Sequence, residues 1–92
     1  MGFLARLFGS TTRYNDAQLV SQAITAITND PLISDPSALV VTSKNGVITL
    51  SGIVYKAQEK DRIEGVVRSA YTTVGLKHER LINELKLPHS AG

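Results

Sequence analysis

The dipeptide Asn45-Gly46, within the stretch KNGVITLSG, constrains the fold of this chain more than any other feature of its sequence. A type I′ turn needs positive φ at both central residues, and Asn-Gly supplies them readily. β-branched residues flank the dipeptide, so we predict a hairpin whose register the two-residue turn fixes, with Lys44 opposite Val47. One face is then apolar, with Leu39, Val41, Ile48 and Leu50, and the other holds Val40, Thr42, Thr49 and Ser51.

Two segments carry the 3.6-residue periodicity of amphipathic helices. Asn15 begins a capping pair for a helix over about residues 16–29, which an Asp-Pro pair ends. Its apolar positions are Val20, Ala23, Ile24 and Ile27, with Leu19 on the flank. A second helix is predicted over about residues 57–73, and Gly75 terminates it. Its apolar stripe consists of Ile63, Val66, Val67, Ala70, Tyr71 and Val74.

A third strand is predicted where Leu81, Leu85 and Leu87 alternate along the sequence. Asn83 falls on the same apolar face, so we expect its amide to be hydrogen-bonded, or to lie at a bulge or at the rim of the sheet. Gly52 indicates a bulge or a close approach of two backbone segments. The predicted order of elements is α-β-β-α-β.

The length of 92 residues allows one small domain with a single core. We assign it to residues 15–87, between a flexible or amphipathic tail over 1–14 and a polar tail over 88–92. The absence of cysteine excludes disulfides, thiolate nucleophiles and Cys-ligated metal sites. A formal net charge of +2 and a pI near 9.2 leave anionic partners open.

The first ten residues, MGFLARLFGS, lack the signals that direct export or lipidation. Arg6 interrupts the apolar run and also stands where a myristoylation signal needs Ser or Thr, and no cleavage site follows. No apolar run approaches the roughly 18 residues of a membrane span. We therefore expect a location in the cytoplasm or peripheral to the inner membrane, and a periplasmic one only for a mature or trimmed form.

Several of these stretches together resemble the BON domain, which is named for bacterial osmotic-stress and nodulation proteins. The resemblance rests on Asp16, Gly46-Val47-Ile48-Thr49-Leu50-Ser51-Gly52, Glu59-Lys60, Gly75-Leu76 and Leu81-Ile82-Asn83-Glu84-Leu85. It implies an α+β sandwich with two helices packed on one face of a three-stranded mixed sheet. It also implies binding of phospholipid, or attachment to membranes and larger envelope assemblies. Lys56 departs from the family, since a Ser-like cap is usual at that position, and about two extra residues lie in the region 77–80.

The sequence contains no constellation of catalytic or metal-binding residues. Its two histidines, His78 and His89, have no motif around them, and no metal-ligand spacing or glycine-rich phosphate loop is present. The eight carboxylates lie in predicted caps, turns and exposed helix faces, where we expect solvated surface charges. The sequence therefore predicts a protein that is not an enzyme and that needs no cofactor or metal.

The N-terminal segment carries an apolar stripe outside the predicted core. Apolar residues recur at helical spacing beside basic ones, which is typical of a short interfacial anchor on an anionic membrane. The residues of this predicted membrane-binding site are Phe3, Leu4, Arg6, Leu7, Phe8 and Arg13. Two alternatives remain open, a disordered tail and a strip folded back onto the domain.

Basic residues also recur along the second predicted helix, where they form a candidate anion-binding site for lipid phosphates or nucleic acid. Its residues are Lys56, Lys60, Arg62 and Arg68. Interleaved acidic residues dilute the positive field, so an ordinary mixed-charge surface is the alternative interpretation. Structural roles are expected for Asn45, Gly46, Gly52 and Gly75.

The resulting hypothesis is a non-enzymatic BON-type binding module that associates peripherally with anionic phospholipid membranes. The alternative is an interaction or assembly module in a stress or envelope system, with a protein partner or a homo-oligomer, because a three-stranded sheet leaves edges open to strand addition. Nucleic acid and small ions are further alternatives, although the sheet carries no aromatic platform for stacking bases.

Overall fold

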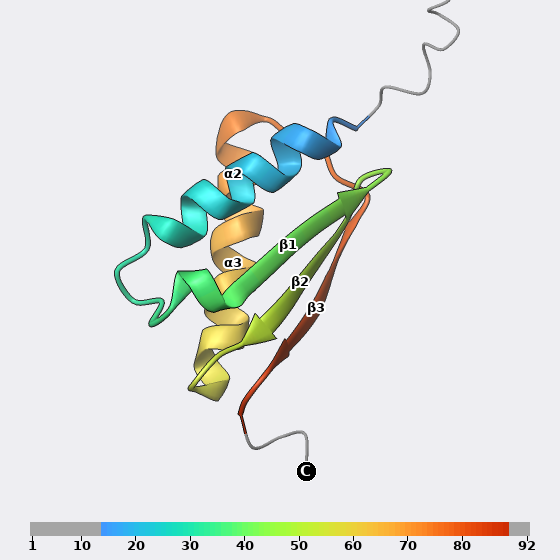
Figure 1. Ribbon diagram of the computed structural model, residues 1–92. Helices are drawn as coiled ribbons and strands as arrows, with labels where there is room; N and C mark the ends of the chain where they lie inside the picture. The colour runs from blue at the N-terminus through green and yellow to red at the C-terminus, as the bar shows by residue number, and fades with distance from the viewer. Residues whose placement is uncertain (1–13, 89–92) are drawn as a thin grey trace, which may run out of the picture.

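The structure, a computed structural model, describes residues 14–88. Its elements are α2 (Asp16–Thr28), the 3-10 helix η2 (Pro36–Ala38), β1 (Leu39–Lys44), β2 (Val47–Ile53), α3 (Ala57–Val74) and β3 (Arg80–Lys86). Figure 1 shows both helices on the same side of the sheet, with α2 beside β1. The predicted α-β-β-α-β order and the α+β fold, with two helices on one face of a three-stranded mixed sheet, are confirmed.

The hairpin of β1 and β2 has the register that its two-residue turn predicts. Lys44 pairs with Val47, Ser43 with Ile48, Thr42 with Thr49, and Val41 with Leu50. The turn residues Asn45 and Gly46 have φ of 51° and 82°, the positive values that a type I′ turn requires. β2 is the central strand, antiparallel to β1 and parallel to β3. The helix-facing side chains of the hairpin enter the core as predicted: Ile48 and Leu50 are fully buried, and Leu39 and Val41 pack against them.

α2 buries two of its predicted core residues and one that was predicted on the flank. The buried residues are Leu19, Ala23 and Ile27. Ala23 and Ile27 are buried as predicted and Val20 is half-buried, but Ile24 remains 49% exposed, so the prediction that put Ile24 in the core and Leu19 on its flank is wrong. The reason lies in the packing of α2 against α3, where the Tyr71 hydroxyl donates to the backbone oxygen of Leu19 at 2.8 Å. This bond is buried, and burial raises the pKa of Tyr71 to about 12.

α3 buries most of its predicted stripe and one residue that the sequence analysis placed in solvent. Ile63, Val67 and Tyr71 are buried, and Val66 and Ala70 are half-buried. Val74, the last residue of the helix before Gly75, is 50% exposed, so its place in the predicted stripe is wrong. Glu59, one turn before Ile63, is only 5% exposed. The expectation that every carboxylate is a solvated surface charge is therefore wrong for Glu59.

Two other predictions about individual residues are confirmed. Gly52 has φ of 117°, and a Cβ there would lie 2.2 Å from the backbone oxygen of Ala38, so two backbone segments approach closely at this point. The amide of Asn83 is hydrogen-bonded, as its place on the apolar face demands. Its Nδ2 donates to the backbone oxygen of Lys60 at 3.0 Å and to Glu64 Oε1 at 3.1 Å.

Candidate functional site

The carboxylate of Asp16 holds the hairpin turn against the start of α2. Its Oδ1 accepts from Ser43 Oγ at 2.7 Å and from the Gly46 N–H at 2.9 Å, while Oδ2 accepts from the Asn45 N–H at 2.8 Å. The bond from the Ser43 hydroxyl is the main reason that the pKa of Asp16 lies below its ordinary value. The expectation of a solvated charge is wrong here too, because three donors of the turn converge on this carboxylate.

Tyr14 connects the N-terminal segment to the same end of the fold. Its hydroxyl donates to Glu79 Oε1 at 2.5 Å, and its ring lies against Gly46, where an added Cβ would be 2.5 Å from Cγ of the ring. The backbone N–H groups of Glu79 and Arg80 donate to the Gly46 oxygen at 2.7 and 3.3 Å. We call this unit the hairpin end; it comprises residues 14–16, 43–46 and 77–80. Figure 1 shows the chain entering the fold there.

Three basic side chains of the hairpin end form no salt bridge with any other residue of the described range 14–88. They are Lys44, Lys77 and Arg80. Both acidic side chains at this end are engaged, Asp16 by the turn and Glu79 by Tyr14. The hairpin end therefore has one more basic than acidic residue, and its cations are free to meet an external anion.

The net charge of the chain resides in its N-terminal segment. The chain has ten basic and eight acidic residues, and Arg6 and Arg13 precede residue 14, so eight of each remain in residues 14–88. The same segment holds both phenylalanines of the chain, Phe3 and Phe8. All six residues of the predicted membrane-binding site, Phe3, Leu4, Arg6, Leu7, Phe8 and Arg13, lie outside the described residues. The basic, apolar segment thus joins the fold at its hairpin end.

At the opposite end of the sheet, Glu59 ties the start of α3 to the connector that follows α2. Its Oε2 accepts from the Ser34 N–H at 3.1 Å and from Ser34 Oγ at 2.5 Å, and Oε1 accepts from the Tyr55 N–H at 3.3 Å. The Ser34 hydroxyl does most to lower the pKa of Glu59, against the opposing effect of burial. Lys56, at the N-cap of α3, provides no side-chain cap.

The predicted anion-binding residues of α3 do not form one group of free cations. Arg62 makes two hydrogen bonds to Asp30, from Nε at 3.0 Å and from Nη2 at 3.1 Å, and this lowers the pKa of Asp30. Arg68 is paired with Glu64, with Nη2 to Oε2 at 3.0 Å. Lys56 and Lys60 form no salt bridge within the described residues, and Lys60 is half-buried. Two of the four cations are therefore neutralised within the fold.

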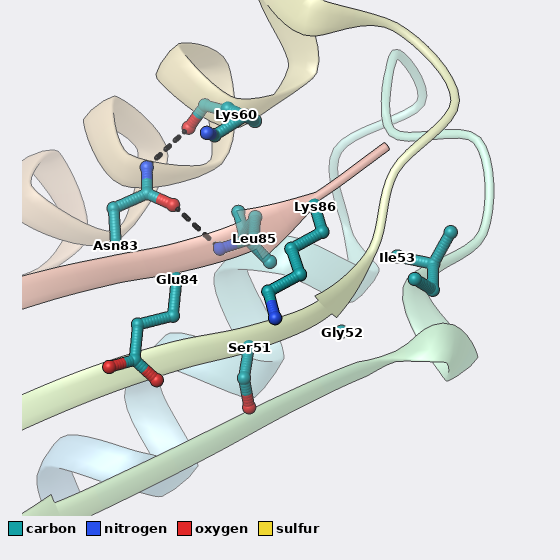
Figure 2. A pocket seen from close by; sticks show the side chains of 8 residues that line it. All are labelled: Ser51, Gly52, Ile53, Lys60, Asn83, Glu84, Leu85 and Lys86. Carbon is teal, nitrogen blue, oxygen red and sulfur yellow. Dashed lines mark hydrogen bonds between the residues drawn. The ribbon is translucent and has the colours of Figure 1, made fainter. Parts of the chain in front are cut away.

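A hollow of about 640 Å³ lies beside the C-terminal half of β3 (Figure 2). Asn83 projects toward α3, and its side chain bonds Lys60, Glu64 and Leu85 of the same chain; its Oδ1 accepts from the Leu85 N–H at 3.1 Å. Lys60 lies on the helix side, and Glu84 and Lys86 extend from the strand. Because the charges alternate and the amide is already satisfied, the hollow offers no convergent set of polar groups for a small ligand.

Other arrangements that would carry chemistry are absent from residues 14–88. No group of three or more His, Asp or Glu residues in this range is placed to hold a metal ion, and none of its helices is long and apolar enough to cross a membrane. The ring of His78 lies 5.2 Å from that of Tyr71, and burial lowers the pKa of His78. This histidine is therefore neutral near pH 7 and packs against the core.

Sequence reasoning missed the two carboxylates and the tyrosine that hold the ends of the fold together. Glu59 had a usable signal, because it lies four residues before Ile63 and so continues the buried stripe of α3 toward its start. Asp16 bonds partners 27 to 30 residues away, and Tyr14 a partner 65 residues away. No local pattern encodes such distant contacts.

Comparison with protein-family models matches residues 15–74 to the BON domain. The matched range begins at the cap of α2, includes the hairpin, and ends with the last residue of α3. A search of curated proteins finds no match to the chain.

Proposed function

Because the chain belongs to the BON domain family, we propose that it is a binding module that associates peripherally with anionic phospholipid membranes through its hairpin end. Members of this family are generally non-enzymatic binding modules, and the family is associated with phospholipid binding. One observation supports the proposal most. The segment that contains the net charge of the chain, and both of its phenylalanines, joins the fold beside three unpaired cations.

The charges of the described residues favour this orientation. The opposite end of the sheet carries three unpaired lysines, Lys56, Lys60 and Lys86, among four carboxylates, Asp35, Glu59, Asp61 and Glu84. The hairpin end has an excess of one basic residue, and the opposite end an excess of one acidic residue. An anionic surface therefore attracts the first end and repels the second.

The energies involved suit reversible binding. A basic side chain near an anionic leaflet contributes about 1 kcal/mol, and the attraction falls off within a Debye length. Lys44, Lys77 and Arg80, with Arg6 and Arg13 of the segment, supply five such residues. The apolar residues Phe3, Leu4, Leu7 and Phe8 add a contribution from insertion that salt does not screen.

Co-sedimentation with vesicles tests the proposal. We expect the full chain to pellet with vesicles of phosphatidylcholine and phosphatidylglycerol and to stay in the supernatant with phosphatidylcholine alone. Removing residues 1–12 should abolish pelleting. The double variant K44Q/R80Q should weaken binding by roughly 10- to 30-fold, at about 1 kcal/mol for each charge.

The matched control is K56Q/K86Q, which removes the same charge from the opposite end and should leave binding within about twofold. Equal loss in the two double variants would mean that only net charge matters and that the hairpin end has no special role. If the full chain fails to pellet with anionic vesicles, the proposed function is wrong.

A further inference from the structure

The two edges of the sheet differ in charge, whereas each leaves some of its outward backbone donors open. At the β3 edge, the Lys86 oxygen accepts from the Val54 N–H at 2.9 Å, so the backbone groups of Lys86 point toward β2. Since these groups alternate in direction along a strand, those of Leu85 point outward, away from the sheet. The outward Leu85 N–H is taken by the side chain of Asn83. Arg80, Glu84 and Lys86 place charges along the same strand. Charges and a satisfied donor are the means by which natural sheets prevent unwanted strand pairing at an edge.

The β1 edge carries no charged side chain before Lys44. Lys44 and Val47 flank the two-residue turn, and their backbone N–H and C=O groups point toward each other. Backbone groups alternate in direction along a strand, so the N–H and C=O groups of Val41 and Ser43 point away from β2. No hydrogen bond within the described residues reaches the N–H of either residue. Two outward donors and their carbonyl neighbours are therefore open along this edge.

The two elements at the β1 edge carry charge only at the hairpin end of the fold. α2 has no charged residue after Asp16, and β1 has none before Lys44. Two large apolar side chains are exposed on these elements, Ile24 at 49% and Val40 at 54%. α2 contacts β1 and lies beside it in Figure 1 on the helix-covered face of the sheet, whereas Val40 lies on the outer face of the same strand. By contrast, all the salt bridges within residues 14–88 involve α3.

We propose that the β1 edge binds a second copy of the chain, with β1 of each copy paired antiparallel to the other about a two-fold axis at Val41. The outward N–H and C=O groups of Val41 then bond each other across the axis, and the Ser43 N–H meets the Leu39 oxygen of the second copy. On the outer face of the joined sheet, Val40 of one copy lies opposite Thr42 of the other. The two sheets become one sheet of six strands.

A second copy suits this surface better than other occupants do because a two-fold contact brings the same patch against itself. A charged patch would meet its own charge, whereas the uncharged side of α2 and β1 meets no repulsion. Six-residue strands alone are small beside the roughly 800 Å² per partner of a stable interface. We therefore include the exposed side of α2, with Ile24, in the proposed contact.

This interface is separate from the proposed membrane contact. Antiparallel pairing of β1 directs the two hairpin ends away from each other, toward opposite ends of the joined sheet. Neither the N-terminal segment nor the cations Lys44 and Arg80 are needed for the contact at Val41. Dimerisation is therefore measured without vesicles, and its failure leaves the membrane proposal untouched.

Light scattering during size exclusion, at increasing concentration of the full chain, tests the inference. We expect a mass of about twice 9.9 kDa. The variant V40K/T42K places like charges opposite each other across the axis and should raise the dissociation constant at least tenfold. V40K/T42E uses the same positions with opposite charges and should restore dimerisation. I82K, the equivalent change on the outer face of β3, should leave the dimer intact.

Two further variants address the helix and the register. I24E should weaken the dimer, whereas V74E, at a helix position of matched exposure on α3, should not. Since the chain has no cysteine, mixed V40C and T42C copies should form a disulfide-linked heterodimer faster than either variant alone. A chain that stays monomeric at every concentration overturns the inference, and so does equal weakening by V40K/T42K and I82K.

Discussion

The two ends of the sheet are each held by one carboxylate, and the two differ in burial. Asp16 is half-buried at the hairpin end and accepts from the turn, while Glu59 is almost fully buried at the opposite end and accepts from two loops. Each carboxylate lies in the first turn of its helix and ties that helix to a segment outside it. The difference in burial determines how much each hydrogen bond contributes to the free energy of unfolding, because water cannot reach a buried acceptor to replace a lost partner.

The comparison shows that a carboxylate fastens each helix of this small fold to a loop, in addition to the Asn15 cap at α2 and in place of a side-chain cap at α3. α3 has no side-chain cap at Lys56, and Glu59 instead bonds the N–H of Tyr55, just before the helix. At the hairpin end the shape of the turn adds a second constraint, since Tyr14 covers Gly46. We therefore expect the stability of the Glu59 end to depend mainly on charge and burial, and that of the hairpin end mainly on backbone shape.

The largest effect is expected at the hairpin end, from Gly46→Val. The substitution puts a β-branched residue at φ of 82° and drives its Cβ into the ring of Tyr14. Backbone strain and overpacking together should lower the free energy of unfolding by about 3 kcal/mol or more. At roughly 4–8 °C per kcal/mol, Tm should fall by roughly 12–24 °C in a thermal melt.

The matched control for that melt is Gly65→Ala, in α3, where an added Cβ meets nothing within 4 Å. It should raise the free energy of unfolding by about 0.5–1 kcal/mol, because alanine favours the helix. An unchanged Tm in Gly46→Val would mean that the turn tolerates a side chain and that shape does not dominate the hairpin end.

The next effect is expected at the opposite end, from Glu59→Gln. The change removes a charged acceptor from three donors in a buried place, and losing such bonds should lower the free energy of unfolding by about 2 kcal/mol. Because the pKa of Glu59 is lowered in the fold, its stabilisation is present above the ordinary value of 4.5 and is lost as pH falls through the lowered pKa. Urea unfolding from pH 7 to pH 3 should therefore show a shallower acid loss in Glu59→Gln than in the wild type.

Some acid loss should remain in that variant, because the pKa values of Asp16, Asp30 and Glu64 are lowered as well. If Glu59→Gln keeps the full pH dependence of the wild type, the buried carboxylate is not the main acid-sensitive contact.

The smallest effect is expected from Asp16→Asn at the hairpin end. Asparagine keeps the shape and one acceptor, and water reaches this half-buried site, so Tm should fall less than in Glu59→Gln. The local effect should be clearer than the global one, because the amides of Asn45 and Gly46 lose a charged acceptor. Their hydrogen exchange, measured by NMR, should accelerate severalfold. A larger fall in Tm for Asp16→Asn than for Glu59→Gln would reverse the comparison.

Sequence patterns predicted the hairpin completely and the helices in part. Asn45-Gly46 permits essentially one turn type, and the turn length then fixes every pair along β1 and β2. In α2, apolar residues occupy two overlapping stripes, so periodicity alone does not decide whether Leu19 or Ile24 faces inward. The contact with Tyr71 decides it, and that contact spans 52 residues of sequence.

The candidate site was less predictable from sequence than the fold. Counting charges identifies Arg62 and Arg68 as cations, but only the structure shows that Asp30 and Glu64 pair with them. Lys44 and Arg80 are far apart in sequence, and the parallel pairing of β3 with β2 brings them to one end of the sheet. Residue types are thus evident from sequence, whereas their pairing depends on the sheet.

The Tyr14 contact has a mechanical consequence. A pull on the N-terminal segment, as from an anchor held at a surface, reaches the fold first at Tyr14, whose ring and hydroxyl contact Gly46 and Glu79. Part of the load then passes through these contacts to the hairpin turn and to Glu79, just before β3, while the backbone carries the rest to α2. Tension is in this way shared between the sheet and the first turn of α2, so the helix does not bear it alone.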